Sequence, residues 1–129
     1  VKALITNEHN QLLVVREREA WDMPGGGLEW GENLHDALQR EIREELGCTA
    51  TIEVQPIMIV PSVNRTYRQQ ALWIIYRAKL DDPQANFDAK YETKYISVDE
   101  FAKSDPAEDT WSSPIDFFDV LKRVVESKN

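Results

Sequence analysis

The chain has 129 residues, and a typical domain has roughly 150, so we expect one globular domain over residues 1–129. Its 42% hydrophobic residues can form a core, whereas 23 acidic against 15 basic side chains give a net charge of -8, which excludes a function led by attraction to a nucleic-acid backbone. The single cysteine, Cys48, excludes an intrachain disulfide and a cysteine-based structural zinc site, and it favours a cytoplasmic location.

Two short apolar runs open the chain. Residues 1–6 and 12–15 are apolar, and the polar residues 7–10 between them are typical of a turn, so this region predicts two antiparallel strands joined as a hairpin. The segment 24–27, Pro-Gly-Gly-Gly, cannot continue a regular element, and its glycines let the backbone approach another group closely. We therefore expect a special loop after the hairpin.

A helix is predicted over residues 34–46. Asn33 before it is a favoured N-cap residue, and Gly47 after it is typical of a helix end. The apolar positions between these two residues recur at a helical period and are Leu34, Leu38, Ile42 and Leu46. This face of the helix is expected to be buried.

Three more strands and a second helix are predicted in the rest of the chain. Residues 49–60 and 67–80 are rich in Ile, Val, Trp and Tyr and are separated by residues 61–65, which favours two long neighbouring strands. Residues 94–98 predict a shorter strand, and the apolar spacing over 114–127 predicts a terminal amphipathic helix. No apolar run approaches the ~20 residues that cross a bilayer, so we expect no membrane partner.

Three glutamates of the predicted helix stand at or beside its apolar face. At about 100° per residue, Glu45 falls inside the apolar arc, and Glu41 and Glu44 lie along its edge. The helix dipole and carboxylate repulsion oppose this placement. Either Arg40 and Arg43 neutralise the cluster on a solvated face, or these hard oxygen ligands hold a divalent cation, Mg²⁺ or Mn²⁺. The intrusion of Glu45 and the nearby glycine loop favour the cation.

Between Gly26 and Cys48 the chain has Gly26, five residues, Glu32, seven residues and the run Arg40-Glu-Ile-Arg-Glu-Glu-Leu-Gly47. This spacing resembles the Nudix box of the Nudix hydrolases, and the lead-in from Trp21 is similar to that of the family. Cys48 departs from the pattern, which usually has an aliphatic residue there; we interpret it as a small packing residue and not as a nucleophile. The resemblance implies a Nudix-type α/β/α sandwich with a mixed sheet, the box helix at about 34–46 and a C-terminal helix at about 114–127.

The resemblance also implies a role for each matched residue. In the family the box holds catalytic divalent cations, here expected to be Mg²⁺ or Mn²⁺, against a diphosphate linkage. Glu41 and Glu45 would be direct ligands, and Glu44 a third ligand or the general base, with Glu41 as the competing candidate for the base. The remaining roles are a contribution to the acidic site from Glu32, a backbone ligand from the carbonyl of Gly26, the orientation of a glutamate by Arg40, and Glu92 as either a further carboxylate or a solvated loop residue.

The reaction expected from the resemblance cleaves a nucleoside diphosphate linked to a moiety X, such as a nucleoside triphosphate or ADP-ribose, into a nucleoside monophosphate and phosphorylated X. Because the cation would meet the phosphates, a net charge of -8 is compatible with this substrate. Arg16 is a candidate for a supplementary phosphate contact. The candidates for stacking on a base are Trp21, Trp30, Tyr67 and Trp73.

A different class of function is a catalytically silent Nudix-fold module that senses a nucleotide or mediates an interaction. Such modules usually lose glutamates of the box, whereas this chain has all four of them: Glu32, Glu41, Glu44 and Glu45. An isomerase of a prenyl diphosphate would need further cysteine and glutamate groups and is the weakest alternative. The expected partner is a nucleotide-type small molecule and not a nucleic-acid polymer, and the expected assembly is a monomer or a homodimer.

Overall fold

The structure is a computed structural model with three helices and seven strands in the part of the chain that it describes, residues 1–16, 20–83, 87, 91–104, 114 and 116–127. These elements are β1 (Lys2–Leu4), β2 (Leu12–Arg16), β3 (Trp21–Asp22), α1 (Leu34–Leu46), β4 (Ala50–Ile52), β5 (Met58–Asn64), β6 (Gln69–Leu80), β7 (Glu92–Ile96), α2 (Val98–Lys103) and α3 (Phe117–Ser127). Within the described residues, no helix is long and apolar enough to cross a membrane.

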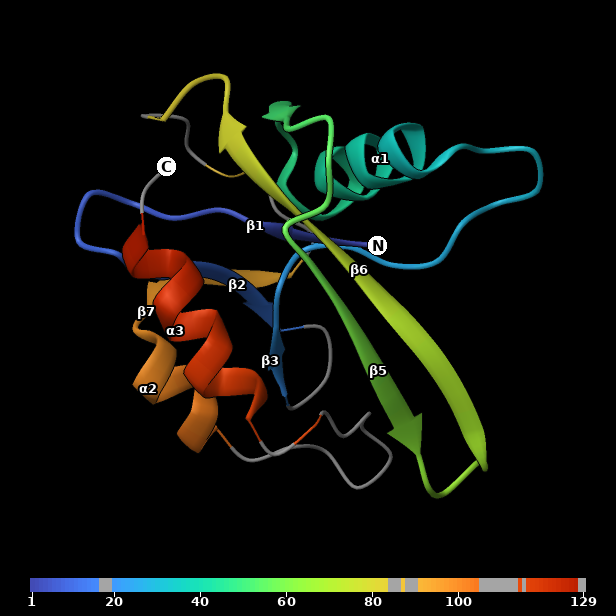
Figure 1. The fold of residues 1–129 in the computed structure, drawn as a ribbon. Coiled ribbons are helices and arrows are strands. Elements are labelled where there is room, and N and C mark those ends of the chain that lie inside the picture. Colours follow the sequence, from blue (N-terminus) through green and yellow to red (C-terminus); the bar gives the residue numbers. More distant parts are fainter. Residues whose placement is uncertain (17–19, 84–86, 88–90, 105–113, 115, 128–129) are drawn as a thin grey trace.

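The strands form two sheets (Figure 1). In the first, β6 is central and pairs with β1, β4 and β5; its pairing with β1 is parallel and the other two are antiparallel. In the second, β2 lies between β3 and β7, and both pairings are antiparallel. The presence of one parallel pair among antiparallel ones confirms the predicted mixed sheet.

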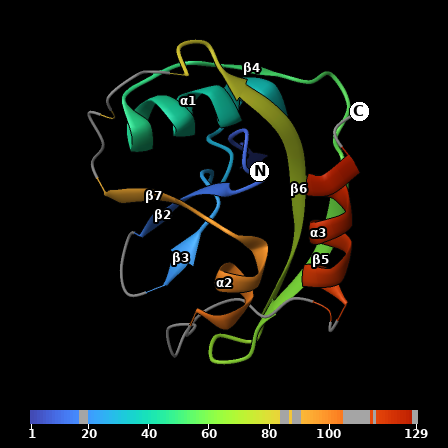
Figure 2. The same cartoon turned by 90° about the vertical axis from the view of Figure 1, so that its left-hand side faces the viewer.

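Alternation along the strands divides the core into two halves. Ala3 and Leu13 face the half that contains the apolar side of α1, whereas the neighbouring Leu4 and Leu12 face the half that contains residues of α2 and α3. Helix α1 therefore covers one side of the sheets, and α2 with α3 covers the other (Figure 2). This arrangement confirms the predicted α/β/α sandwich.

Helix α1 has the predicted bounds, residues 34–46, because both of its ends are capped. The side chain of Asn33 accepts a hydrogen bond from the backbone N–H of Asp36, and Gly47 adopts a left-handed φ of 71° while its N–H donates to the carbonyl of Arg43. A left-handed residue costs least as glycine, so the helix ends there. The buried residues of α1 are Ala37, Leu38, Ile42, Glu45 and Leu46.

The predicted N-terminal hairpin is confirmed beside its turn, where Thr6 and Leu12 form an antiparallel bridge, but its two strands do not stay paired beyond that point. Residues 7–10 do form a turn, and the N–H of Leu13 donates to the carbonyl of Ile5 at 2.8 Å. However, β1 then pairs with β6 and β2 pairs with β3 and β7, so the two strands separate into different sheets. Both runs are buried on two sides, and the local pattern carries no information about their distant partners.

The long strand predicted over 49–60 is two strands. The N–H of Glu53 donates to the carbonyl of Arg77, and that of Ile57 donates to the carbonyl of Ile75, so the chain between them bulges away from β6 and interrupts the ladder. The separator predicted at 61–65 was also wrong, because β5 continues through Pro61 to Asn64. Within the described residues β5 pairs only with β6, and an edge strand tolerates a proline.

The C-terminal elements are shifted from their predicted positions. Strand β7 ends at Ile96, two residues before the prediction, because Ser97 caps the unpredicted helix α2 by accepting from the N–H of Glu100. The terminal helix begins at Phe117 and not at residue 114, since Pro114 belongs to the preceding turn, where its carbonyl accepts from the N–H of Phe117. The short strand β3 was also not predicted.

Candidate active site

The glycine loop is attached to β1 through backbone hydrogen bonds. Val1 and Gly26 exchange a reciprocal pair, at 2.8 Å from the nitrogen of Val1 and 3.0 Å from that of Gly26, and the N–H of Ala3 donates to the carbonyl of Pro24 at 2.8 Å. Gly25 has a φ of 148°, and a Cβ there would lie 2.0 Å from the carbonyl oxygen of Val1. Glycine is therefore required at this position to bring the loop against β1.

Gly26 gives the loop its close approach to Glu41. A Cβ on Gly26 would lie 2.6 Å from Oε1 and 2.7 Å from Cδ of Glu41, so the carboxylate occupies the space that any other side chain would need. The Glu41 side chain is only 16% exposed. The loop and the helix are thus packed together, with the backbone of Gly26 beside a carboxylate.

Glu45 is the buried carboxyl group of the site. The backbone N–H of Gly25 faces both of its oxygens at 3.4 Å, which is a weak contact. Burial raises the pKa of Glu45 to about 8; the Lys2 ammonium and the Gly25 N–H oppose the shift, and the adjacent Glu41 adds to it. A bound cation would reverse this preference for the neutral form, because it stabilises the carboxylate.

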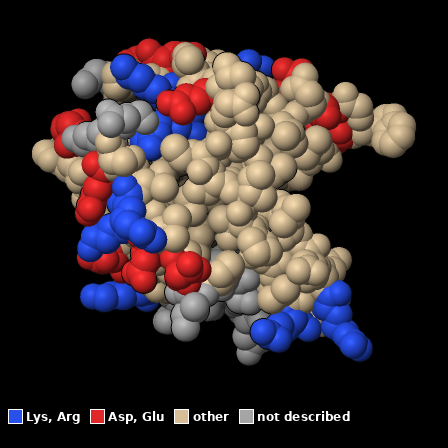
Figure 3. Space-filling view, viewed as in Figure 1, with Lys and Arg blue, Asp and Glu red and all other residues tan. Residues whose placement is uncertain are grey.

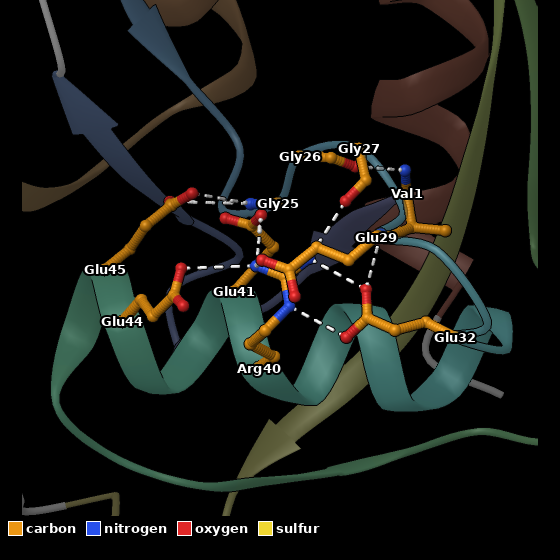
Figure 4. A network of polar contacts seen from close by, with 10 residues as sticks. All are labelled: Val1, Gly25, Gly26, Gly27, Glu29, Glu32, Arg40, Glu41, Glu44 and Glu45. Carbon is orange, nitrogen blue, oxygen red and sulfur yellow. Dashed lines mark hydrogen bonds and ion pairs between the residues drawn. The ribbon is translucent and has the colours of Figure 1, made fainter.

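Arg40 connects the other glutamates (Figure 4). Its guanidinium donates to both oxygens of Glu32 at 2.8 and 3.0 Å, to Glu41 at 2.9 Å and to Glu44 at 3.2 Å, and it also reaches the carbonyl of Gly27 at 3.0 Å. The bidentate bond holds the pKa of Glu32 below its usual value. Glu44 is the most exposed of the four box glutamates, at 57% of its side chain, and Arg40 also forms a longer ion pair with the exposed Glu29 at 3.7 Å.

The residues of this cluster fit a hard divalent cation. Their donor atoms are carboxylate oxygens and a backbone carbonyl, which are the ligands that Mg²⁺ and Mn²⁺ prefer. In the described part of the chain, no three His, Cys, Asp or Glu side chains stand ready to hold a metal ion together. The Arg40 guanidinium lies among three of the carboxylates, so metal binding would need Glu41 and Glu44 to turn from it.

A second polar group lies on β2, β3 and β7. Arg16 is opposite both Trp21 and Glu92 in the sheet, and it forms an ion pair with Glu92. The guanidinium of Arg16 and the ammonium of Lys94 lie 4.9 and 4.5 Å from the centre of the Trp21 ring. The structure thus brings Arg16, Trp21 and Glu92 together, and among the described contacts Glu92 meets Arg16 and not the box glutamates.

The remaining aromatic candidates lie apart from one another. Tyr67 is 61% exposed in the turn between β5 and β6, at the end of the hairpin that points away from α1 (Figure 1). Figure 3 shows basic side chains at this end of the molecule. Trp30 is fully exposed on the loop before α1. Trp73 lies on β6 and packs against the second half of the core.

Cys48 packs against the first half of the core, and burial raises the pKa of its thiol, which agrees with its interpretation as a packing residue.

Three residues near the site were not among the sequence-based candidates: Lys2, Asp22 and Lys94. Lys2 is 7% exposed, and its ammonium donates to Asp22 at 2.7 Å and lies 4.7 Å from the centre of the Trp73 ring. A lysine inside an apolar run was the available signal, because lysine is rarely buried without a partner. Asp22 and Lys94 had no such signal, since their positions follow from strand pairing.

The geometry defines a class of protein, an α/β/α sandwich in which a glycine-rich loop and a glutamate-bearing helix form one polar site. The chain belongs to the NUDIX domain family, whose model matches residues 1–117. This match confirms the resemblance seen between Gly26 and Cys48.

The chain is similar to the nucleoside triphosphatase NudI of Escherichia coli O81 (strain ED1a), with 36% identity over 80 residues that cover 58% of this chain and 56% of that protein. It is also similar to the RNA pyrophosphohydrolase of Ruthia magnifica subsp. Calyptogena magnifica, with 41% identity over 49 residues that cover 36% of this chain and 27% of that protein. The matches span less than two thirds of the length of these relatives.

Solved structures share the fold over nearly the whole chain. A UDP-X diphosphatase has a TM-score of 0.69 at 20% identity, with coverage of 99% of this chain and 62% of that one. The MutT protein of Methanosarcina mazei Go1 has a TM-score of 0.64 at 25% identity, with coverage of 99% and 93%. The likeness at low identity extends the family assignment to the fold.

Proposed function

We propose that the protein hydrolyses the diphosphate linkage of a nucleoside diphosphate attached to a moiety X, and that the reaction needs Mg²⁺ or Mn²⁺. The observation that carries this proposal is the convergence of Glu41 and Glu45 on the backbone of Gly25 and Gly26. Two carboxylates on a buried helix face oppose the local electrostatics, so a cation gives them a physical reason to be there. Their placement favours the cation over neutralisation on a solvated face.

Glu41, Glu45 and the carbonyl of Gly26 would hold the cation directly, with Glu44 and Glu32 beside them. When bound, the cation supplies neutralisation of the phosphate charge and a more acidic water. Glu44 would take the proton from that water, because its exposed carboxylate can move without leaving the helix. Arg40 would keep Glu32 and the loop carbonyl of Gly27 in place while the other glutamates turn toward the cation.

The substrate proposed is a nucleotide. The named relatives are a nucleoside triphosphatase and an RNA pyrophosphohydrolase. In this chain Arg16 and Lys94, each also paired with a glutamate, lie against the ring of Trp21, so cationic groups and an aromatic surface stand together there. These groups suit a phosphorylated nucleoside better than a phosphate without a base.

The first test is a hydrolysis assay over nucleoside triphosphates, ADP-ribose, nucleotide sugars and dinucleoside polyphosphates. Pyrophosphatase or phosphatase, as each product requires, converts the product to inorganic phosphate, which is measured. Turnover with Mg²⁺ or Mn²⁺ that stops in EDTA and returns when the metal is restored is the expected result. Nucleotide binding without turnover of any compound would contradict the proposal and favour the catalytically silent sensing module.

Single substitutions distinguish the general base from the metal ligands. Glu44→Gln is expected to lower kcat by about 10²–10⁴-fold, the usual contribution of a general base, while the Mg²⁺ concentration for half-maximal rate changes little. Glu41→Gln is expected to raise that Mg²⁺ concentration as well, because it removes a ligand. Rate measurements over a Mg²⁺ titration distinguish the two, and the opposite pattern would assign the base to Glu41.

A further inference from the structure

Lys2 is a buried cation that the proposed chemistry does not use. Its side chain is 9% exposed, and in the part of the chain that the structure describes its ammonium has one hydrogen-bond acceptor, Asp22, and one ring contact, Trp73. An ammonium has three N–H donors, so two remain for other groups. Burial of a charge is costly, and here it is offset by the half-exposed Asp22 carboxylate and by electrostatic attraction to Glu45.

The position of Lys2 connects the cation site with the aromatic residues. Strand β1 pairs with the glycine loop at Gly25, and a Cβ on Gly25 would lie 3.0 Å from Cδ of Lys2. On its other side, Gly25 faces the carboxyl group of Glu45. A substrate with its phosphates at Glu41 and Glu45 would therefore lie close to Lys2, which is beside Gly25 and against the ring of Trp73.

Asp22 places acceptors next to these donors. One of its oxygens accepts from Lys2 at 2.7 Å and the other accepts from the N–H of Met23 at 2.8 Å, which leaves lone pairs on both. Its side chain is 54% exposed, so a ligand can reach it. Lys2 and Asp22 thus present a donor and an acceptor side by side, with the ring of Trp73 against the Lys2 ammonium.

We propose that Lys2 and Asp22 select nucleotides whose base carries a ring carbonyl beside a ring N–H. Guanine, hypoxanthine, uracil and thymine have this pair of groups: the carbonyl would accept from Lys2, and the ring N–H would donate to Asp22. Adenine and cytosine have an amino group beside an unprotonated ring nitrogen, which would oppose donor to donor and acceptor to acceptor. This inference rests on the proposed function, since it names the substrates of that site.

The test compares substrates that differ only at these two groups. For the full chain with Mg²⁺, kcat/KM is expected to be at least about tenfold higher for ITP than for ATP, and for UTP than for CTP, because the disfavoured base leaves two polar groups unpaired. Lys2→Met keeps the apolar stem and is expected to reduce both ratios to within about twofold. Lys79→Met, an exposed lysine on β6, is the matched control and is expected to leave both ratios unchanged.

The outcomes separate this inference from the proposed function. Wild-type ratios near one, or ratios that survive in both Lys2→Met and Asp22→Ala, would overturn it; the second variant alters a half-exposed side chain, so it remains informative if Lys2→Met does not fold. If no nucleotide is hydrolysed, calorimetry with IMP and AMP still decides. In that case the absence of turnover contradicts the proposed hydrolysis, about tenfold or tighter binding of IMP than of AMP would still support the selection, and equal binding would overturn it.

Discussion

Replacement of Glu45 by glutamine is expected to abolish most metal-dependent hydrolysis, with a loss of about 10²–10³-fold in kcat at saturating Mg²⁺. The amide keeps the size and the contact with the Gly25 N–H but removes the negative charge that a cation would require, and such a cation contributes several kcal/mol to the transition state. The measurement is the rate of phosphate release for wild type and variant over a Mg²⁺ titration.

The same variant is expected to be more stable than the wild type when no metal is present. The pKa of Glu45 is raised to about 8 by burial, from 4.5, so the neutral carboxyl stabilises the fold fully below pH 4.5. That contribution is lost as the pH rises through 8, because the unfolded chain already releases the proton near pH 4.5, whereas the folded chain has to release it from a buried group near pH 8. Glutamine does not titrate, so the variant should gain of the order of 2 kcal/mol over the wild type near pH 8 and little near pH 5.

Thermal denaturation in EDTA at pH 5, 6.5 and 8 measures this difference, with Glu126→Gln on the exposed face of α3 as the matched control. The control removes a carboxylate without altering a buried group, so its melting temperature should follow that of the wild type. Equal stability of Glu45→Gln and wild type at all three pH values would show that the buried carboxyl costs nothing, and full activity would remove Glu45 from the site.

Gly26→Ala is expected to lower kcat/KM by about 10²-fold with little change in global stability. The new Cβ would stand 2.6 Å from Oε1 of Glu41, and the carboxylate would have to move away from the loop. A displacement of about 1 Å at a site that positions reacting groups costs about this factor. The measurement is steady-state kinetics together with a melting curve.

The adjacent glycine provides the control. A Cβ on Gly27 would meet nothing within 4 Å, and Gly27→Ala keeps the carbonyl that accepts from Arg40. We expect Gly27→Ala to retain activity within about threefold, since nothing in its surroundings is displaced. Equal losses in both variants would mean that loop flexibility, and not the space beside Glu41, sets the rate.

Local sequence spacing was sufficient to predict α1 and the glutamates on it. Asn33 and Gly47 define the ends of the helix. Residues three or four positions apart share a helix face, so the linear sequence alone predicts the cluster of Glu41, Glu44 and Glu45. The partners of these groups do not follow, because they come from elsewhere in the chain. The approach of Gly25 to Glu45 depends on the backbone pairing of the loop with β1.

The same limit explains the missed residues and the separation of the two hairpin strands. Strand β1 has its partner about seventy positions away in β6, where Lys2 pairs with Ile75, and no local pattern encodes that register. The burial of Lys2 follows from this pairing and from the loop that covers it, so its ammonium emerges as a candidate only in three dimensions. Lys94 likewise reaches Trp21 through two neighbouring strand pairings.

Strand β1 has a consequence for the order in which the molecule is assembled. Its three residues hold the glycine loop on one side and pair with residues 75–77 of β6 on the other. During synthesis, the loop and α1 leave the ribosome well before β6 does. Strand β1 therefore cannot pair with β6 until more than half of the chain has been made. Closure of such a distant contact is entropically costly and slow. The pairing that fixes β1 in the sheet, and with it the glycine loop, can therefore form only once β6 has been made, although the loop and the helix are close in the sequence.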